Sequence, residues 1–114
     1  WRTLNLQSIA DGGIEAAVLR LYESRRPADR FDKNFDSKQR KKVLNALEYL
    51  EKHLPQLSTQ KMGLAEASAV SLVDYMHLRF SHENLGNHFP RLFAWAANWN
   101  RIGWVQETAP PINP

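Results

Sequence analysis

The sequence predicts an all-α domain, a bundle of four to five helices around one central buried helix. Apolar residues recur at helical spacing along most of the 114 residues, and no segment alternates between apolar and polar residues for long enough to form a convincing strand. The run Gly63–Phe80 is apolar on almost every side, which is typical of a helix in the protein interior. A single domain of this size buries about two-thirds of the surface that its unfolded chain exposes, enough for a core.

The first helix is expected from Leu4 to Arg26, because apolar side chains recur there at helical spacing and Pro27 disfavours helical geometry in the residue before it. These side chains are Leu6, Ala10, Ile14, Ala17, Val18 and Leu21. Gly12 and Gly13 lie in the middle of this helix, where each costs up to about 1 kcal/mol relative to alanine. We therefore expect close packing by a neighbouring backbone there, or a bend.

A second helix follows, and Pro55 stops it. Its inward stripe consists of Val43, Leu47, Leu50 and Leu54. Asp36 is a candidate N-cap. Basic residues at a helix start oppose the macrodipole, however, so we expect the helix to begin earlier, near Ala28, with Asp29 and Asp32 in its first turns.

The central helix comes after a short polar linker, residues 56–62. Positions that recur at helical spacing along it are Ala69, Val73, Met76 and Phe80. Gly63 can occupy its N-cap, and Glu66 can reach back to the free backbone N–H groups. Charged residues interrupt the helix, and its continuous apolar run is far shorter than the roughly 20 residues that a bilayer requires. A buried helix is therefore expected rather than a membrane span.

The remaining chain is predicted to contain a polar surface loop, residues 81–88, and a last helix that starts at Pro90. The apolar stripe of that helix is Leu92, Trp95, Ala96 and Trp99, and its tryptophans are expected in the core. Gly103 is a candidate stop, residues 104–108 can add one more turn, and the proline-rich ending cannot continue a helix.

Composition limits the function classes. The chain has no cysteine, which excludes disulfides, thiolate metal sites and a cysteine nucleophile, and which suits a cytoplasmic protein. Its formal charge of +3 and its pI near 9.5 support no claim about nucleic acid. The chain begins with Trp1 rather than Met, and no secretory leader precedes the first helix, so we expect that an upstream part has been removed.

Two kinds of site find little support in the pattern of residues. His77 and His82 are five residues apart across a helix end, which is no metal-ligand spacing, and His77 is expected to be a hydrogen-bonded residue of the central helix. Aspartates interleave the one basic cluster, so a solvated, ion-paired face is expected there rather than a nucleic-acid site. The cluster comprises Arg25, Arg26, Arg30, Lys33, Lys38, Arg40, Lys41 and Lys42.

Three groups of residues share a recognisable order and spacing. The first is IADGGIEAA, residues 9–17, and the second is RRP followed by Phe35, Gln39, Lys42, Val43 and ALEYLE. The third is the central helix with FPRLFAWAANW and the closing TAPP. Together they resemble the C-terminal helical domain of the glutathione S-transferase superfamily, in particular its bacterial members. The family usually starts the central helix with Ser or Thr and an Asp three residues later, whereas this chain has Gly63 and Glu66.

The resemblance covers nearly the whole chain and implies a division of labour. In the family, a thioredoxin-like N-terminal domain binds glutathione and supplies the catalytic Ser, Tyr or Cys. The helical domain forms one wall of the pocket for the hydrophobic electrophile and much of the homodimer contact. No strand–helix–strand pattern of that kind is present in this chain. Residues 1–114 are therefore expected to be one helical domain of a cytoplasmic detoxifying transferase that uses glutathione as co-substrate.

Alone, this domain is expected to be inactive, with no catalytic residue and no metal ligand of its own. The alternative is a non-catalytic protein-interaction module, since similar domains also serve in translation factors and synthetase complexes.

The resemblance also points to five residues of the first helix. Glu15 aligns with a position where some members place a carboxylate that reaches across the dimer to the charged end of the partner's glutathione. Asp11 has a similar role in this interpretation, and a solvated surface carboxylate is the alternative for both. Leu21, Tyr22 and Arg25 occupy the later turns, which in the family face the electrophile pocket. An apolar wall with one phenol suits a hydrophobic substrate, unless Leu21 is core and Tyr22 a partly buried surface ring.

Overall fold

The computed structural model describes the backbone of residues 2–101 and the side chains of residues 5–101. The long helices are α1 (Arg2–Ser24), α2 (Lys33–Lys52), α3 (Leu64–Arg79) and α5 (Pro90–Arg101), and α4 (Leu85–His88) is one short turn. Two 3₁₀ turns, η1 (Leu54–Gln56) and η2 (Ser81–Glu83), lie between them. No strand occurs among residues 2–101, and the predicted all-α class is confirmed. The predictions for residues 103–108 lie outside the described residues.

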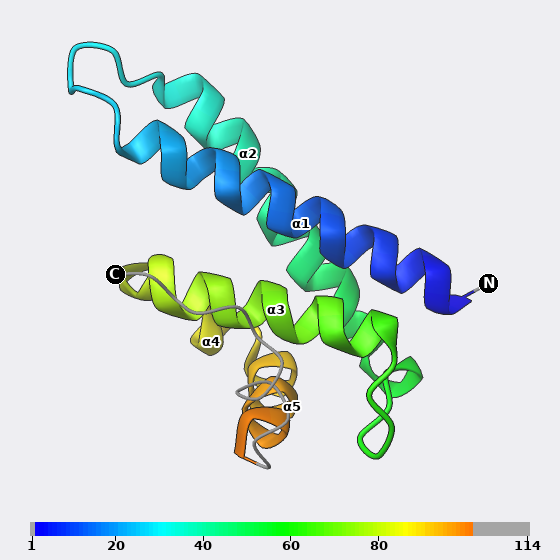
Figure 1. Cartoon of the computed structure of the whole chain (residues 1–114). Coiled ribbons are helices and arrows are strands. Elements are labelled where there is room, and N and C mark those ends of the chain that lie inside the picture. Colours follow the sequence, from blue (N-terminus) through cyan, green and yellow to red (C-terminus); the bar gives the residue numbers. More distant parts are fainter. Residues whose placement is uncertain (1, 102–114) are drawn as a thin grey trace.

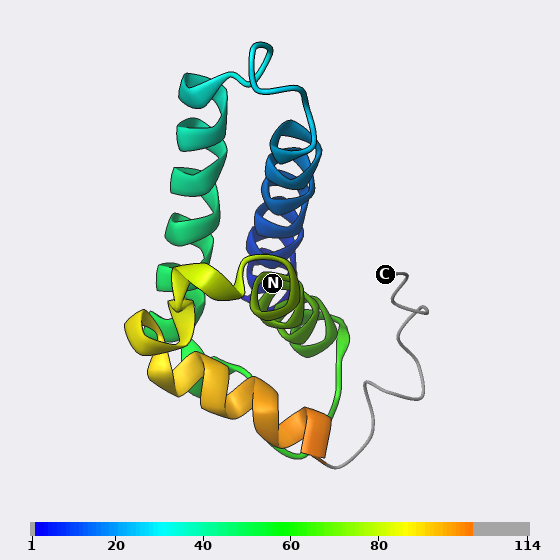
Figure 2. The same ribbon diagram turned by 90° about the vertical axis from the view of Figure 1, so that its left-hand side faces the viewer.

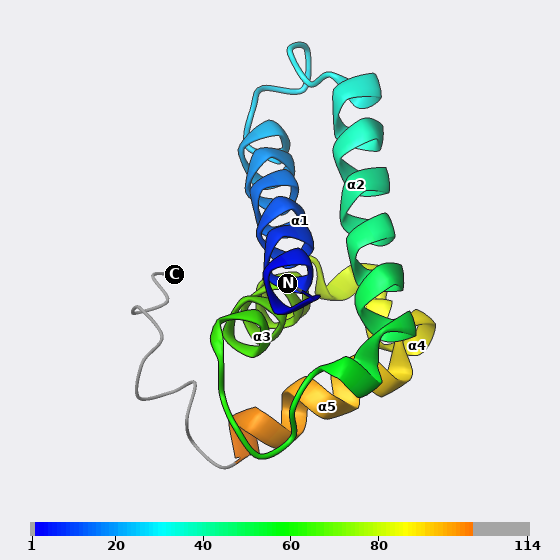
Figure 3. The ribbon, with the colours of Figure 1, turned by 90° about the vertical axis from the view of Figure 1, so that its right-hand side faces the viewer.

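The helices form a long antiparallel pair with a second layer packed across it (Figure 1). Figures 2 and 3 show α1 and α2 side by side, joined by the loop at their far end, and α5 on the opposite side of the molecule from that loop. Helix α3 packs along α1 and also contacts α5, so it lies between the two layers. The predicted central helix is therefore confirmed.

The core is made where α3 meets its neighbours. Ala69, Val73 and Met76 of α3 are buried as predicted, and so is Phe80 at its end. The two tryptophans of α5, Trp95 and Trp99, are also buried, which confirms that they are core residues.

One side of α3 does not match the prediction of a helix enclosed all round. Leu64 is 68% exposed and Leu78 is 52% exposed. Helix α1 covers one side of α3 and α5 another, but no element within residues 2–101 covers the stripe that carries these two leucines. This uncovered stripe becomes important for the candidate site.

The start of α2 differs from the prediction. The N-cap is Asp32, whose backbone is extended and whose carboxylate accepts a 3.0 Å hydrogen bond from the backbone N–H of Phe35. The predicted start near Ala28 is wrong because residues 27–30 form a turn, closed by a 2.8 Å bond from the Arg30 N–H to the Pro27 carbonyl. Asp36 is not the cap either: it lies in the first helical turn, where a carboxylate favours the macrodipole.

The start of α3 follows the predicted chemistry. Gly63 is the N-cap, and a carboxylate oxygen of Glu66 accepts a 2.9 Å hydrogen bond from the Gly63 N–H. The second oxygen of Glu66 accepts another 2.9 Å bond, from the Ser58 N–H of the preceding linker. Glu66 therefore anchors both the helix start and the linker, although glycine supplies no side-chain cap.

The predicted loop over residues 81–88 is more regular than expected. It contains η2 and α4, separated by Asn84 in the left-handed conformation with φ 53°. A single left-handed asparagine is tolerated because its short side chain limits the steric cost. Pro90 is the first residue of α5, as predicted.

The two adjacent glycines of α1 have different surroundings. A Cβ atom on Gly13 would lie 2.8 Å from Leu72 Cδ2 and 2.9 Å from Ala46 Cβ, whereas one on Gly12 would meet nothing within 4 Å. Close packing is therefore present at Gly13, where α1, α2 and α3 meet, but the neighbours are side chains and not the predicted backbone, and Gly12 has open space.

Alanine at the two positions should change stability in opposite directions. Gly12→Ala should raise the free energy of unfolding by about 0.5–1 kcal/mol, since alanine restricts the unfolded chain and suits a helix. Gly13→Ala should lower it by about 1 kcal/mol or more, because overpacking a core costs roughly 1–3 kcal/mol and Ala46 Cβ has no side-chain torsion with which to move aside. Urea unfolding followed by circular dichroism measures both. Equal shifts would contradict the packing at Gly13.

Candidate functional site

Four of the five residues that sequence analysis proposes for a site lie on α1, and the fifth, Arg25, follows directly after its end. Asp11 and Glu15 are both exposed, and four residues apart they lie on the same side of the helix. Tyr22 comes seven residues after Glu15, about 10 Å further along the helix axis. Seven residues make nearly two full turns, so Glu15 and Tyr22 share one side of α1 and differ only in their position along the helix. The predicted roles of both groups stay predictions.

The three pocket candidates differ in burial. Leu21 is half-buried and packs against the core, whereas Tyr22 is 62% exposed and Arg25, just after the end of α1, is also exposed. Tyr22 and Arg25 are therefore the members of this set that are open to a ligand. Their role in binding one stays a prediction.

Two residues of α3 join Tyr22 and Arg25. Tyr75 and Arg79 are both half-buried, one helical turn apart, and Tyr75 interacts electrostatically with Tyr22, Arg25 and Arg79. Burial raises the pKa of the Tyr75 hydroxyl above its ordinary value and the Tyr22 phenol acts in the same direction, while Arg79 and Arg25 oppose them. We call these four residues, Tyr22, Arg25, Tyr75 and Arg79, the aromatic–basic wall.

Sequence reasoning missed the α3 half of this wall. The signal was a narrow stripe of polar-tipped side chains at helical spacing, Ser68, Ser71, Tyr75 and Arg79. On a helix interpreted as apolar all round, this stripe marks the side that other helices leave uncovered.

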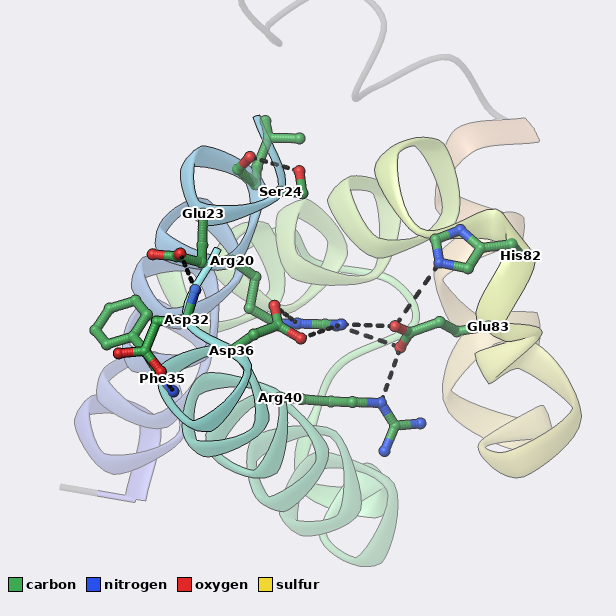
Figure 4. Close-up of polar contacts among 10 residues, drawn as sticks. Arg20, Glu23, Ser24, Asp32, Phe35, Asp36, Arg40, His82 and Glu83 are labelled. Atoms are coloured by element: carbon green, nitrogen blue, oxygen red, sulfur yellow. Dashed lines mark hydrogen bonds and ion pairs between the residues drawn. The ribbon is translucent and has the colours of Figure 1, made fainter. Parts of the chain in front are cut away.

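A second cluster of charges lies inside the molecule (Figure 4). Arg20 is 5% exposed. Its guanidinium binds Asp36 of α2 at 3.1 Å and Glu83 of η2 at 2.7 Å, and it lies 4.5 Å from the centre of the Phe80 ring. Arg40 adds a 3.3 Å contact to Glu83. The cluster joins α1, α2 and the η2 turn.

Arg20 and Glu83 stabilise each other's ionised forms. Burial by itself would lower the pKa of Arg20, but hydrogen bonds to Glu83 and Asp36 outweigh it and raise that pKa. Burial likewise favours the neutral form of Glu83, yet Arg20 and Arg40 bring its pKa below the ordinary value. Since the carboxylates already have partners, the cluster is structural. Sequence analysis missed it, although Arg20 follows the buried Ala16 and Ala17 at helical spacing.

Three hollows on the surface are lined by other residues. One lies between the end of α3 and α4, one between the 54–60 segment and α5, and one of about 380 Å³ between α1 and α2. The α1–α2 groove contains Ile9, Gly12, Lys42, Asn45 and Tyr49. Tyr22 and Arg25 line none of these three, and both side chains are exposed, so they lie on an open part of the surface.

Other proposed sites can be located in the same structure. His77 is exposed on α3, and no group of three or more metal-ligating side chains occurs in the part of the chain that the structure describes. Within the basic cluster, Arg26 pairs with Glu23 at 3.4 Å and Arg40 pairs with Glu83. Among the helices described, none combines the length and the apolar character needed to cross a bilayer.

Comparisons with known proteins place this fold. No protein-family model matches the chain, and no curated protein matches it. Among solved structures, a glutathione transferase family member from Pseudomonas fluorescens Pf-5, with bound glutathione, matches with a TM-score of 0.88 and 27% identity over 98% of this chain. A glutathione S-transferase from Methylobacillus flagellatus KT, also with glutathione bound, matches with a TM-score of 0.84 and 26% identity over 96% of this chain.

A third structure supports the fold alone. It is a glutathione S-transferase from Methylobacterium radiotolerans JCM 2831 in complex with glutathione sulfonate, with a TM-score of 0.84 at 17% identity over 98% of this chain. The chain spans about half of the length of these proteins, 54–55% of each.

The arrangement of helices therefore defines a helical domain of the kind found in glutathione transferases. More particularly, the chain has the fold of the C-terminal helical domain of the glutathione S-transferases, and the resemblance noted in the sequence is confirmed.

Proposed function

We propose that this chain is the C-terminal domain of a dimeric glutathione transferase and forms one wall of its electrophile pocket. The observation that carries the proposal is the match of nearly the whole chain to about half of two proteins that have glutathione bound. In this proposal a thioredoxin-like N-terminal domain holds glutathione as co-substrate and supplies the catalytic residue. The helical chain contributes binding surface and no catalytic group.

Exposed apolar side chains on α1 and α3 support a partner that covers part of these two helices. Leu19 and Tyr22 are exposed on α1, and Leu64 and Leu78 are exposed on α3. Apolar groups that gather on a surface mark binding sites more often than single scattered ones do. An upstream domain seated against these helices would cover part of them and leave the Tyr22–Arg25 end as the wall of a substrate pocket.

The α1–α2 side is the proposed dimer surface. It carries the groove described above, and the open space at Gly12 allows another chain to approach the α1 backbone. Asp11 and Glu15 follow in the same part of α1, both exposed. From there, a carboxylate could reach the ammonium group of glutathione held by the partner subunit, a charge-assisted hydrogen bond.

An activity assay tests the proposed division of labour. The 114-residue chain should convert glutathione and a reactive aryl halide no faster than the uncatalysed rate, whereas the complete gene product should accelerate the conjugation. Size-exclusion chromatography with light scattering should show the complete protein as a homodimer.

Two results would contradict the proposal. Turnover by the chain alone would show that it carries catalytic groups. A gene product without a thioredoxin-like segment upstream of Trp1 would rule out the proposed transferase function. In the second case, co-purification with a translation factor or a synthetase would favour the alternative interaction module.

A further inference from the structure

We infer that the aromatic–basic wall selects aromatic substrates that carry a negative charge, such as a carboxylate or a sulfonate. The inference rests on the proposed function, because it names the class of electrophile that the same pocket would take. It adds Tyr75 and Arg79 of α3 to the predicted residues of α1 and gives each a chemical reason.

The wall brings four groups together from two packed helices. Tyr22 lies in the last turn of α1, and Arg25 follows directly after the helix, with its backbone N–H bonded to the Tyr22 carbonyl at 3.2 Å. Tyr75 precedes Arg79 by four residues on α3, so these two lie on one side of that helix. Helices α1 and α3 pack along each other (Figure 1). The Gly13 position of α1 lies against Leu72 of α3, and the Arg20 guanidinium lies 4.5 Å from the centre of the Phe80 ring, so the C-terminal halves of α1 and α3 run side by side. The influence of Tyr22 and Arg25 on the pKa of Tyr75 agrees with this arrangement.

The acidic residues closest in sequence to Tyr75 and Arg25 have hydrogen-bond partners outside the wall. Asp74, next to Tyr75, accepts a 2.7 Å hydrogen bond from Asn100 of α5. Glu23, between Tyr22 and Arg25, accepts a 2.7 Å bond from the Asp32 N–H and contacts Arg26. Among the described side chains, none forms an ion pair with the guanidinium of Arg25. An anion brought to Arg25 would therefore gain a charge-assisted contact without displacing an internal partner.

Apolar surface beside the cations favours an aromatic body over a small inorganic anion. Leu19 lies one turn before Tyr22, and Leu78 lies three residues after Tyr75, and both are exposed. Phenol rings and leucines offer flat apolar contact, and an arginine can also stack on an aromatic ring. An alternative explanation for the arginines is the helix macrodipole, because a cation near a helix C-terminus stabilises the helix without any ligand. That effect explains the two cations but not the exposed Tyr22 ring and the exposed leucines around them.

The half-buried phenol has a separate task. A tyrosine hydroxyl is neutral near pH 7, and burial raises the pKa of Tyr75 further. A neutral phenol can donate a hydrogen bond to a carboxylate or sulfonate oxygen. Arg25 would attract the anionic group of the ligand, and the hydrogen bond from Tyr75 would orient that group.

Two fluorescent probes that differ in one charged group test the inference on the chain as it is. They are 8-anilinonaphthalene-1-sulfonate and its uncharged analogue N-phenyl-1-naphthylamine, titrated without glutathione. The sulfonate should bind about tenfold more tightly than the neutral probe. Arg25→Gln should remove about that factor for the sulfonate and leave the neutral probe unchanged. Arg25→Lys should retain much of the preference, and Tyr75→Phe should weaken sulfonate binding by a few-fold.

The matched control is Arg30→Gln, which removes the same charge from an exposed position in the α1–α2 loop and should change neither affinity. Unchanged circular dichroism and unfolding midpoints verify that the variants are folded. Equal affinity for the two probes, or equal loss in Arg25→Gln and Arg30→Gln, would overturn the inference. These titrations need no second domain, so they can be separated from the activity assay. If the chain binds the sulfonate selectively but the complete protein has no transferase activity, the proposed function is refuted and the site stands. If the complete protein is active but the chain does not prefer the sulfonate, only the site is refuted.

Discussion

Replacing Arg20 with alanine should lower the free energy of unfolding by about 3–5 kcal/mol, because it removes a buried cation from two partly buried carboxylates and leaves Asp36 without an ion pair. Asp36 and Glu83 both bind the Arg20 guanidinium, and the Glu83 side chain is only 11% exposed. After the substitution, Glu83 keeps Arg40, and Asp36 loses its ion pair. The total free energy of unfolding of a small domain is about 5–15 kcal/mol. This single change should therefore bring the chain close to the limit of stable folding.

Chemical denaturation at neutral pH measures the loss, and Arg40→Gln is the matched control. Arg40 binds the same carboxylate, but its side chain is 43% exposed, so its loss should cost about 1 kcal/mol or less. Similar losses for the two variants would show that burial of the cluster is energetically unimportant.

The pH dependence gives a second check on the same cluster. Glu83 has a pKa below its ordinary value in the folded chain, since its arginine partners outweigh its burial. Its stabilising contribution is therefore present above the pKa of an unfolded carboxyl and is lost as the pH falls through the lower, folded pKa. The stability gap between the unchanged chain and Arg20→Ala should narrow over that acidic range.

The order of the helices could be predicted from the sequence because apolar spacing and proline mark it clearly. Pro27, Pro55 and Pro90 separate the long helices, and the buried stripes lie where helical periodicity places them. The start of α2 could not be predicted equally well. Three aspartates, Asp29, Asp32 and Asp36, offered similar capping chemistry, and the choice among them depends on tertiary contacts, above all on Glu23, which binds the Asp32 N–H.

The candidate site was predictable only in part. The α1 residues came from resemblance to a family, and the α3 residues were hidden because an apolar helix shows no obvious outer side. Periodicity tells which residues share a side of a helix, but not which side its neighbours leave bare. Leu64 and Leu78 look like core residues in the sequence, and their exposure is the clue that α3 has an uncovered stripe. Long-range pairs such as Arg20 and Glu83 have no local signal at all.

Leu72→Ala should lower the free energy of unfolding by about 2–5 kcal/mol, the range for a large cavity in a packed core. Leu72 has no exposed surface and lies against the Gly13 position of α1. The control within the same helix is Leu78→Ala, where the side chain is 52% exposed and the change should stay within about 0.5 kcal/mol. If Leu72→Ala and Leu78→Ala lower the free energy of unfolding equally, α3 does not pack between its neighbours as described.

Combining Leu72→Ala with Gly13→Ala tests the contact itself. A Cβ at position 13 would lie 2.8 Å from Leu72 Cδ2, so shortening Leu72 should relieve part of the strain that Gly13→Ala introduces. The double variant should therefore be more stable than the sum of the single losses predicts, by about 0.5–3 kcal/mol, the usual coupling between residues in contact. Relief should be incomplete, because Ala46 Cβ remains 2.9 Å from the same position. Strictly additive losses would mean that α1 and α3 do not approach each other at Gly13, and the wall built on their packing would lose its support.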